Sequence, residues 1–368
     1  MIPPADGAHD GGARGRGARG RGARSNRAGR FERTRVEPRA EPDPVLDEEA
    51  PPPLVTTVTP EIARTIISAN DSPDVPFEQS INPYRGCEHG CVYCFARPTH
   101  AYLGLSPGLD FETRLFSKPD AARLLRAELR RPGYACRTIA LGANTDPYQP
   151  IERRLGITRA VLEVLAEHRH PVAVVTKSAL VLRDLDLLAA MARDRLASVM
   201  VSITTLDGGL ARRMEPRAAT PARRLETLRA LAAAGVPTGV LASPMIPGLN
   251  DAEVEAIVAA AAGAGAASAD YVVLRLPLEI KDLFREWLET HVPLRAQRVL
   301  ALVRDLRGGR LYDPAFGARM RGEGPIADLL RRRFEVARRR HGLTARPAPL
   351  ATGLFRVPPR AGDQGRLF

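Results

Sequence analysis

The sequence is poor in cysteine and lysine, and it has no long apolar run. No stretch of the 368 residues approaches the roughly 18 consecutive apolar residues that a membrane-spanning helix needs. The first residues, MIPPADGAHDGG, lack the apolar core of a secretory signal. Four cysteines, three of them crowded together, do not suit a disulfide scaffold. We therefore expect a cytoplasmic protein, in which such a cluster binds metal or takes part in catalysis.

Positive charge is in excess, and nearly all of it comes from arginine. The formal net charge is +12, and only three of the 54 basic residues are lysines: Lys118, Lys177 and Lys281. Arginine prefers planar, bidentate partners such as phosphate. The excess therefore fits nucleic-acid binding, although the Ala- and Arg-rich coding of a GC-rich genome would produce the same composition.

Residues 1–55 are predicted to form a disordered tail. The stretch GGARGRGARGRGARSNRAGR (11–30) carries seven arginines and no acid, and the stretch that follows at 37–53 is acidic and rich in proline. Low hydrophobicity with block charge cannot offset the entropy lost when a chain becomes ordered. The arginine–glycine tract has two interpretations: it binds nucleic-acid phosphates, or it is a solvated tail without a dedicated partner.

From about residue 75, short β-type runs alternate with amphipathic helical runs. After a first run in SINPYRG (80–86), strands are predicted within 137–146, 170–178, 196–205, 236–248 and 270–277, with helices between them. This alternation predicts βαβ units and a parallel sheet, either doubly wound or closed as a barrel. Polar residues gather at the C-terminal ends of the strands, the ligand-binding edge in both architectures. From about residue 280 the pattern becomes helical.

The cysteines are concentrated in the stretch INPYRGCEHGCVYCFARPTH, where three of the four lie within eight residues: Cys87, Cys91 and Cys94. Three thiolates with His89 or His100 suit a zinc site. Three thiolates alone suit a [4Fe–4S] cluster whose fourth iron binds a small chelating molecule. A single glycine-bearing loop directly after a strand favours the cluster, because structural zinc sites usually present two ligand pairs on separate turns.

The stretch CEHGCVYC, with Tyr93 as its aromatic residue, resembles the C-x3-C-x-aromatic-C signature of the radical SAM superfamily. Together with GANTDPYQPIE, the longer stretch around it resembles the branch related to spore photoproduct lyase, often labelled DNA repair photolyase-like. The resemblance covers about residues 75–290 and implies an α/β fold, a partial (β/α)6 TIM-like barrel. The helical pattern predicts a C-terminal extension at 291–342, and a flexible tail is expected at 343–368.

The resemblance also implies a cofactor arrangement. The three cysteines would bind three irons of a [4Fe–4S] cluster, and S-adenosylmethionine would chelate the fourth. An electron donor such as flavodoxin or ferredoxin would reduce the cluster, and cleavage of the sulfonium would give a 5′-deoxyadenosyl radical. The implied S-adenosylmethionine ligands are Tyr93 near the adenine, Asn144, Thr145 and Asp146 at the methionyl ammonium, Lys177 at its carboxylate and Ser202 at the ribose.

Each of these polar residues also has a purely structural interpretation. The GANTD segment is typical of an Asx turn or a helix N-cap. Lys177 also fits a solvated strand end, and the Ser202 hydroxyl also fits a contact with the next helix.

The sequence departs from photoproduct lyases at the hydrogen-donating cysteine that these enzymes carry at the end of the second strand. The corresponding residue here is Ala143. Cys136 lies at the opposite end of that strand, about 20 Å away at the rise of an extended chain, and is interpreted as a small apolar residue. Tyr84 and Tyr148 are the remaining candidates for a hydrogen relay, although tyrosines near a barrel mouth commonly serve packing.

Three functions therefore remain open from the sequence. The first is a lyase-like radical SAM enzyme that acts on nucleic acid, as in DNA repair. The second is a radical SAM enzyme with a peptide or small-molecule substrate. The third is a non-catalytic nucleic-acid-binding protein that carries zinc or a cluster.

The chain ends in QGRLF, which resembles the short peptides with which bacterial replication and repair proteins bind the sliding clamp. Leu367 and Phe368 would fill an apolar pocket of the clamp, and Gln364 would form a hydrogen bond at its rim. Gly365 stands where such peptides usually have a hydrophobic residue. The sequence thus predicts a sliding clamp as a second partner.

Overall fold

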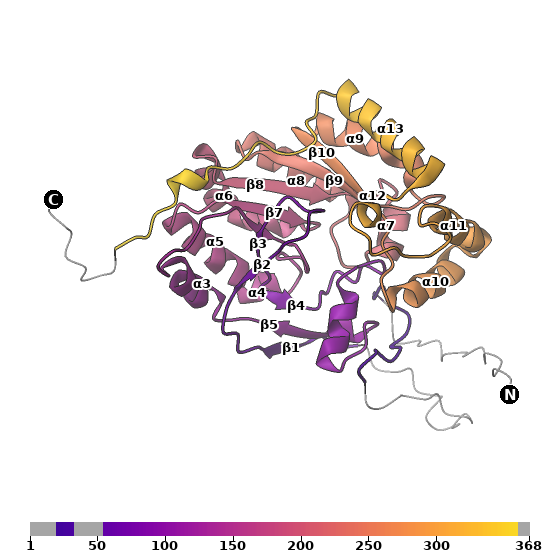
Figure 1. Cartoon of the computed structure of the whole chain (residues 1–368), viewed down its shortest axis with the longest axis horizontal. Helices are drawn as coiled ribbons and strands as arrows, with labels where there is room; N and C mark the ends of the chain where they lie inside the picture. Colours follow the sequence, from indigo (N-terminus) through magenta and orange to yellow (C-terminus); the bar gives the residue numbers. More distant parts are fainter. Residues whose placement is uncertain (1–19, 33–53, 360–368) are drawn as a thin grey trace.

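The computed structural model describes residues 20–32 and 54–359 and is built around one curved sheet (Figure 1). Six parallel strands follow one another across this sheet, and β2 (Ile67–Ala69) pairs antiparallel with the first of them. The parallel strands are β3 (Gln79–Ile81), β6 (Ile139–Leu141), β7 (Val172–Thr176), β8 (Ala197–Ser202), β9 (Thr238–Met245) and β10 (Ser268–Val273). The predicted partial TIM-like barrel is confirmed.

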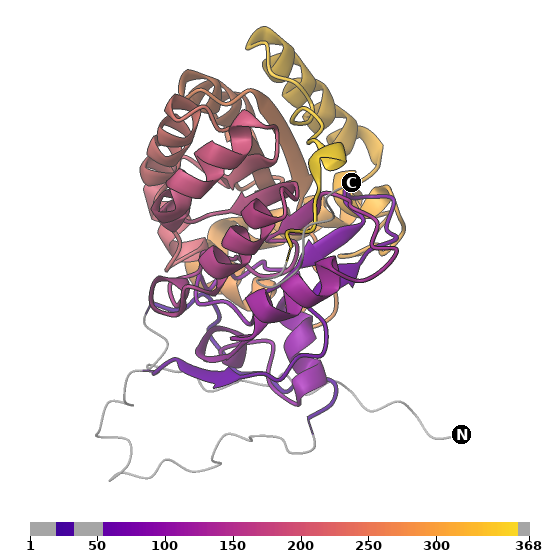
Figure 2. The same cartoon turned by 90° about the vertical axis from the view of Figure 1, so that its left-hand side faces the viewer.

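Helices surround the outside of the sheet, as the side view shows (Figure 2). They come between successive strands, and their apolar faces are buried against the sheet. The principal ones are α3 (Ala121–Leu129), α5 (Ile157–Glu167), α6 (Leu185–Arg193), α8 (Pro221–Ala233) and α9 (Val254–Gly263). Shorter pieces are α4 (Glu152–Leu155), α7 (Gly208–Met214), η2 (Ala179–Asp184) and η3 (Asp251–Glu253).

Local sequence explains these elements well. In β7 the residues Val172, Val174 and Thr176 are buried, and the intervening residues are half-buried, as in a strand covered on both faces. At the start of α8 the Thr220 hydroxyl accepts a hydrogen bond from the amide of Arg223, and a proline occupies the first turn. These boundaries agree with the capping pattern in the sequence.

A second, smaller sheet lies next to the barrel and was not predicted. It joins β1 (Thr57–Pro60), β5 (Arg114–Ser117) and β4 (Tyr84–Arg85), with β5 in the centre. The helical pieces η1 (Arg97–Leu103) and α2 (Asp110–Thr113) connect it to the cysteine loop. The strands of this sheet are four residues long or less, too short to show a hydrophobic period in the sequence.

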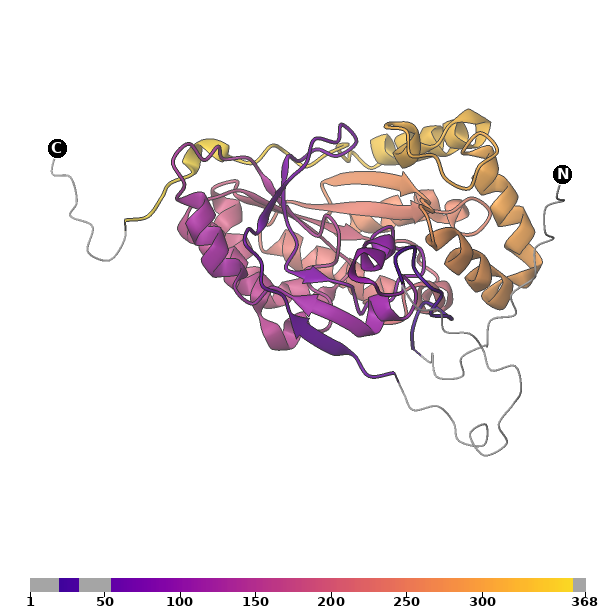
Figure 3. The same cartoon turned by 60° about the horizontal axis from the view of Figure 1, so that its bottom comes forward.

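Residues 20–32 correct the prediction of a disordered tail for this part of the chain. They run alongside the segment that contains η1 and α2, as Figure 3 shows in indigo. Arg21 is 8% exposed and Ala23 is 1% exposed. The remaining parts of the predicted tail, 1–19 and 33–53, lie outside the described residues.

The chain is helical from about residue 280 to 340, as predicted, with α10 (Ile280–His291), α11 (Pro293–Asp305), α12 (Ala318–Arg321) and α13 (Gly324–Arg340). Residues 343–359 correct the expectation of a flexible tail for this part of the chain: Thr344 forms a bridge to Ser268, the amide of Ala351 donates to the carbonyl of Arg195 at 2.9 Å, and η4 (Thr352–Leu354) follows. Within the described residues, none of the helices combines the length and the apolar character that crossing a membrane requires. Gln364, Leu367 and Phe368 lie outside the described residues, so clamp binding stays a prediction.

Candidate cofactor site

One cavity of about 470 Å³ collects all the side chains that the sequence suggested as cofactor ligands. It opens at the C-terminal ends of the parallel strands, the edge expected to bind ligands. The nine residues that meet there are Cys87, Cys91, Tyr93, Cys94, Asn144, Thr145, Asp146, Lys177 and Ser202. They come from four separate segments of the chain, the cysteine loop and three strand ends, and the fold brings these segments together.

The cysteine loop adopts its shape because two glycines take left-handed backbone angles. Gly86 has φ of 76° and Gly90 has φ of 67°, a region that residues with a Cβ rarely enter. A Cβ on Gly86 would also lie 2.8 Å from the carbonyl oxygen of Phe111. The loop therefore needs glycine at both positions to turn, once just before Cys87 and once between Cys87 and Cys91.

The side chain of Arg97 holds the cysteine loop in place. Its fully buried guanidinium donates hydrogen bonds to the carbonyls of Cys91, Pro107 and Gly108 at 2.9–3.0 Å. It also forms a 2.5 Å ion pair with the buried carboxylate of Glu112. The side chain of Gln149 holds the other end of the loop through the amide of Glu88 and the carbonyl of Gly86.

The segment at 20–32 completes the hydrogen bonding of Glu112. The backbone amides of Gly22 and Ala23 donate to its carboxylate at 2.9 and 2.8 Å. Gly22 also packs directly on the loop, since a Cβ there would lie 1.5 Å from the carbonyl oxygen of Gly90. Part of the arginine–glycine tract is thus a structural element of the cysteine loop.

The donor set fits an iron–sulfur cluster. Cys87, Cys91 and Cys94 all line the cavity, and none forms a disulfide. Burial raises the pKa of each thiol, so cluster binding as thiolates involves the release of protons.

Each histidine of the zinc alternative is engaged through one ring nitrogen, and His89 lines the cavity while His100 does not. Nε2 of His100 lies 2.9 Å from the carbonyl oxygen of Arg114, and Nδ1 of His89 lies 3.4 Å from a carboxylate oxygen of Asp146. Among the residues that the structure describes, no three His, Cys, Asp or Glu side chains converge on a single-ion site. In a cluster each cysteine binds a different iron, so the thiols need not converge on one point.

Asp146 organises the loop after β6. Its Oδ1 accepts hydrogen bonds from the amide of Tyr148 and the hydroxyl of Thr176, and its Oδ2 accepts one from the amide of Lys177 at 2.8 Å. Burial opposes its charge, but attraction to the His89 ring and these hydrogen bonds outweigh burial and lower the pKa of Asp146. The GANTD segment therefore forms the turn of the structural interpretation, and its residues Asn144, Thr145 and Asp146 also line the cavity.

Asn144 and Thr145 differ in how their side chains are engaged. The Thr145 hydroxyl donates to the carbonyl of Tyr84 at 3.0 Å. Asn144 is half-buried and lines the cavity, and among the described residues it has one hydrogen bond, from its backbone amide to the Asn82 side chain. Asn144 is thus the residue of GANTD whose side chain is best placed to meet a ligand.

Lys177 and Ser202 are joined to each other at the cavity wall. The Lys177 ammonium donates to the Ser202 hydroxyl at 2.8 Å, and that hydroxyl donates to the carbonyl of Ser243 at 3.2 Å. Burial lowers the pKa of Lys177. The lysine is not the solvated strand-end residue of the alternative interpretation.

A buried base beneath these residues was missed from the sequence. The carboxylate of Glu215 accepts hydrogen bonds from Tyr93, Thr204 and Arg224, and it lies 3.5 Å from the Lys177 ammonium. Glu215 and Arg224 are both at most 2% exposed. They lie nine residues apart around a helix start, and no local pattern in the sequence distinguishes them from ordinary surface charges.

The two tyrosines suggested as hydrogen relays lie outside the cavity wall. Both are fully buried: Tyr84 donates its hydroxyl to Glu152, and the ring of Tyr148 packs under the guanidinium of Arg183. Cys136 also lies outside the cavity, half-buried before β6. Ala143 does line the cavity, so the position of the missing cysteine is as expected.

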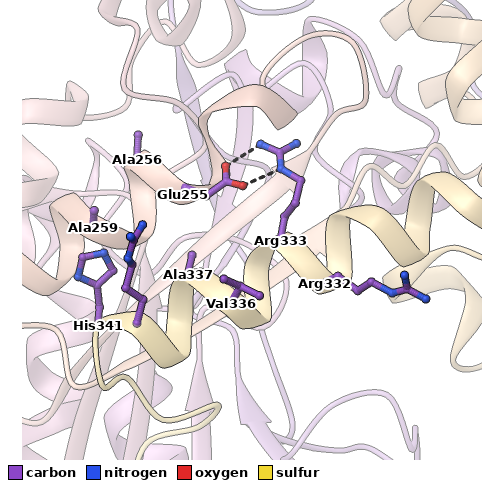
Figure 4. Close-up of a pocket in the computed structure, with 9 residues that line it drawn as sticks. Glu255, Ala256, Ala259, Arg332, Arg333, Val336, Ala337 and His341 are labelled. Atoms are coloured by element: carbon purple, nitrogen blue, oxygen red, sulfur yellow. Dashed lines mark hydrogen bonds and ion pairs between the residues drawn. The ribbon is translucent and has the colours of Figure 1, made fainter.

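A second hollow lies between α9 and α13 (Figure 4). A bidentate ion pair between Glu255 and Arg333, at 2.7 and 2.6 Å, crosses it. It contains none of the suggested cofactor ligands.

Comparison with known proteins identifies a family and several similar sequences. A family model described as the radical SAM superfamily matches residues 81–261. An uncharacterized protein of Mycobacterium tuberculosis is 37% identical over 289 residues, 78% of this chain and 82% of the relative. An uncharacterized protein of Methanocaldococcus jannaschii is 29% identical over 173 residues, 47% of this chain and 62% of the relative.

Solved structures with a similar fold include spore photoproduct lyase complexed with dinucleoside spore photoproduct. That chain is 15% identical, with a TM-score of 0.56, and the similarity covers 78% of this chain and 81% of the lyase. A double mutant of the lyase with bound AdoMet and dinucleoside spore photoproduct is also similar, at 15% identity and a TM-score of 0.54 over 78% and 80% of the two chains.

Proposed function

The chain belongs to the radical SAM superfamily, and on that premise we propose that Cys87, Cys91 and Cys94 hold a [4Fe–4S] cluster whose remaining iron is chelated by S-adenosylmethionine. When bound, the reduced cluster supplies the electron that cleaves the sulfonium into methionine and a 5′-deoxyadenosyl radical. The observation that carries the proposal is the meeting of three thiols with six polar or aromatic cofactor candidates in one cavity.

The side chains of this cavity suit the two ends of the methionyl group. The Lys177 ammonium attracts the carboxylate, and a charge-assisted hydrogen bond of this kind is stronger than a neutral one. The Asn144 amide oxygen accepts from the ammonium. Asp146 acts as a positioning residue, because both of its oxygens are occupied by donors from the protein.

Tyr93 offers its ring to the cavity while its hydroxyl stays bound to Glu215 and Thr204. This anchoring leaves the ring as an apolar surface for the adenine. Ser202 keeps the Lys177 ammonium at the cavity wall and contributes its oxygen toward the ribose.

We further propose that the substrate is a nucleic acid, as in DNA repair, and that flavodoxin or ferredoxin donates the electron. The fold it shares with a lyase complexed with a dinucleoside photoproduct supports this substrate, as does the net charge of +12. The source of the hydrogen atom that quenches the product radical differs from that in photoproduct lyase, because Ala143 occupies the position of the cysteine that donates it there.

Anaerobic reconstitution with iron and sulfide tests the chemistry. After reduction and addition of S-adenosylmethionine, the wild-type protein should form 5′-deoxyadenosine, and Cys91→Ala should form none. Cys136→Ala is the matched control, because its thiol lies outside the cavity, and it should retain the activity. Metal analysis that finds zinc alone in the purified protein, or a loaded cluster that gives no product with or without nucleic acid, would contradict the proposal.

A further inference from the structure

The wall of the cavity contains many residues besides the suggested cofactor ligands, some of them on β3 and β9. The loop between β2 and β3 contributes Ser72 and Phe77, the residue after the last cluster cysteine contributes Phe95, and the end of β10 with α12 contributes Arg275 and Met320. Radical chemistry at the cofactor can reach only a substrate that is held within the same cavity. This part of the wall is therefore the place to look for substrate contacts.

Arg275 is a cation in this wall that forms no ion pair with any carboxylate of the described residues. Within the described part of the chain, its only hydrogen-bond partner is the thioether sulfur of Met320, 3.5 Å from Nη1. Its Nε is buried and has no partner. A thioether is a weak acceptor, so most of the hydrogen-bonding capacity of this guanidinium is unused.

The neighbouring Arg319 shows what a structural arginine looks like at this wall. It forms an ion pair with Asp74 and a hydrogen bond with Ser72, which together tie α12 to the β2–β3 loop. Asp74 also accepts from the amide of Gly317. Its charge acts on Arg275 only at longer range, because the two side chains form no hydrogen bond or ion pair with each other, and the hydrogen-bonding capacity of Arg275 stays unused. An unpaired buried donor is unfavourable unless a ligand satisfies it, and an anionic ligand is the natural partner of Arg275.

Phe95 adds a second recognition element. Its ring is 43% exposed although it follows a half-buried cysteine directly. The Arg275 guanidinium lies 5.0 Å from the centroid of this ring. A planar cation against an exposed aromatic ring suits a ligand that combines a flat base with an anionic group.

We infer that Phe95 and Arg275 form a nucleotide subsite, in which Arg275 binds a backbone phosphate and Phe95 stacks on the adjoining base. The inference rests on the proposed function, because it assigns the substrate contacts of the same cavity. Arginine binds phosphate bidentately, and stacking on an aromatic ring accepts any base. The subsite therefore selects single-stranded or unstacked nucleotides without reading their sequence.

Fluorescence anisotropy of a labelled single-stranded oligodeoxynucleotide tests the subsite with the full-length, reconstituted protein. Arg275→Gln should weaken binding about tenfold, since it removes a charge-assisted contact, and should lower the salt slope by about one. Phe95→Ala should weaken binding at least about fivefold through lost stacking. Arg275→Lys keeps the positive charge but loses the two parallel N–H donors of the guanidinium. Its affinity for the oligodeoxynucleotide should therefore lie between those of wild type and Arg275→Gln.

Arg298→Gln is the matched control, because it removes the same charge from an exposed position on α11 outside the cavity. Loss of affinity in Arg275→Gln no greater than in this control would overturn the inference. Equal dependence on Arg275 and Phe95 for a labelled polyglutamate peptide would also overturn it, in favour of a general anion site.

Formation of 5′-deoxyadenosine by the wild-type protein, measured without nucleic acid, reads out the proposed function separately. If the wild type forms it and Arg275→Gln binds like the control, the subsite is wrong and the radical chemistry stands. If the wild type forms none while the Arg275 and Phe95 variants lose binding selectively, the subsite stands and the chemistry is wrong.

Discussion

The carboxylate of Glu112 should be one of the most important single groups for the stability of the cysteine loop. It is fully buried and accepts hydrogen bonds from Arg97 at 2.5 Å and from the amides of Gly22 and Ala23. Glu112→Gln keeps the shape of the side chain but removes the charge and turns one acceptor into a donor. Arg97, itself fully buried, then loses its only carboxylate partner among the described residues.

Breaking a buried ion pair by removing one partner destabilises a protein by about 3–5 kcal/mol. Glu112→Gln should therefore lower the Tm of the apo protein by roughly 10 °C, measured by circular dichroism under anaerobic conditions. The amides of Gly22 and Ala23 should also lose protection in hydrogen exchange, because their acceptor is weakened. The second measurement separates detachment of residues 20–32 from general unfolding.

Glu167→Gln is the matched control, because it breaks an ion pair of similar length on the surface. Arg126 and Glu167 are paired at 2.7 Å with side chains that are 44% and 47% exposed, and such pairs contribute about 0.2–1 kcal/mol. A Tm change for Glu112→Gln as small as that for Glu167→Gln would refute the placement of Glu112 as a buried anchor.

Two further predictions concern the buried histidine His170 and the cofactor pocket. Burial lowers the pKa of His170 to about 4, so protonation favours the unfolded chain: stability is present above the unfolded pKa of 6.5 and falls as the pH drops toward 4. Urea titrations should show a loss of about 3 kcal/mol over that window that is absent in His170→Asn. Lys177→Met should weaken S-adenosylmethionine binding about tenfold in equilibrium dialysis, while Lys281→Met, outside the cavity, should not.

The repeating part of the fold was predictable because its elements satisfy local rules. Alternating apolar runs and capped amphipathic helices identify β6 to β10 and the helices between them, with boundaries within a few residues. The parallel order follows from the helical crossovers. The meeting of the suggested cofactor ligands in one cavity was predictable for a related reason: in a parallel barrel, polar residues at the C-terminal strand ends meet at one edge.

The parts that were missed depend on contacts between distant residues. Residues 20–32 have a composition typical of disorder, yet Gly22 and Ala23 lie against a carboxylate about ninety residues away in the chain. Glycine is required for that approach because only a residue without a Cβ fits beside the carbonyl of Gly90. Composition describes the average tendency of a segment to be ordered. It contains no information on a single buried acceptor elsewhere in the chain, here the carboxylate of Glu112, that holds the segment in place.

The same distinction separates what the cysteine motif specifies from what it leaves open. Spacing in one loop favours the proposed cluster, because it lets three thiols reach one cofactor from a single turn of chain. The proposed substrate contacts have no such local constraint, since Phe77, Phe95 and Arg275 reach the cavity from segments up to about two hundred residues apart. Selectivity among substrates can therefore change by single substitutions in this wall while the cysteine loop stays the same. Binding assays on wall variants, compared between relatives of this chain, are the direct way to learn what each of them acts on.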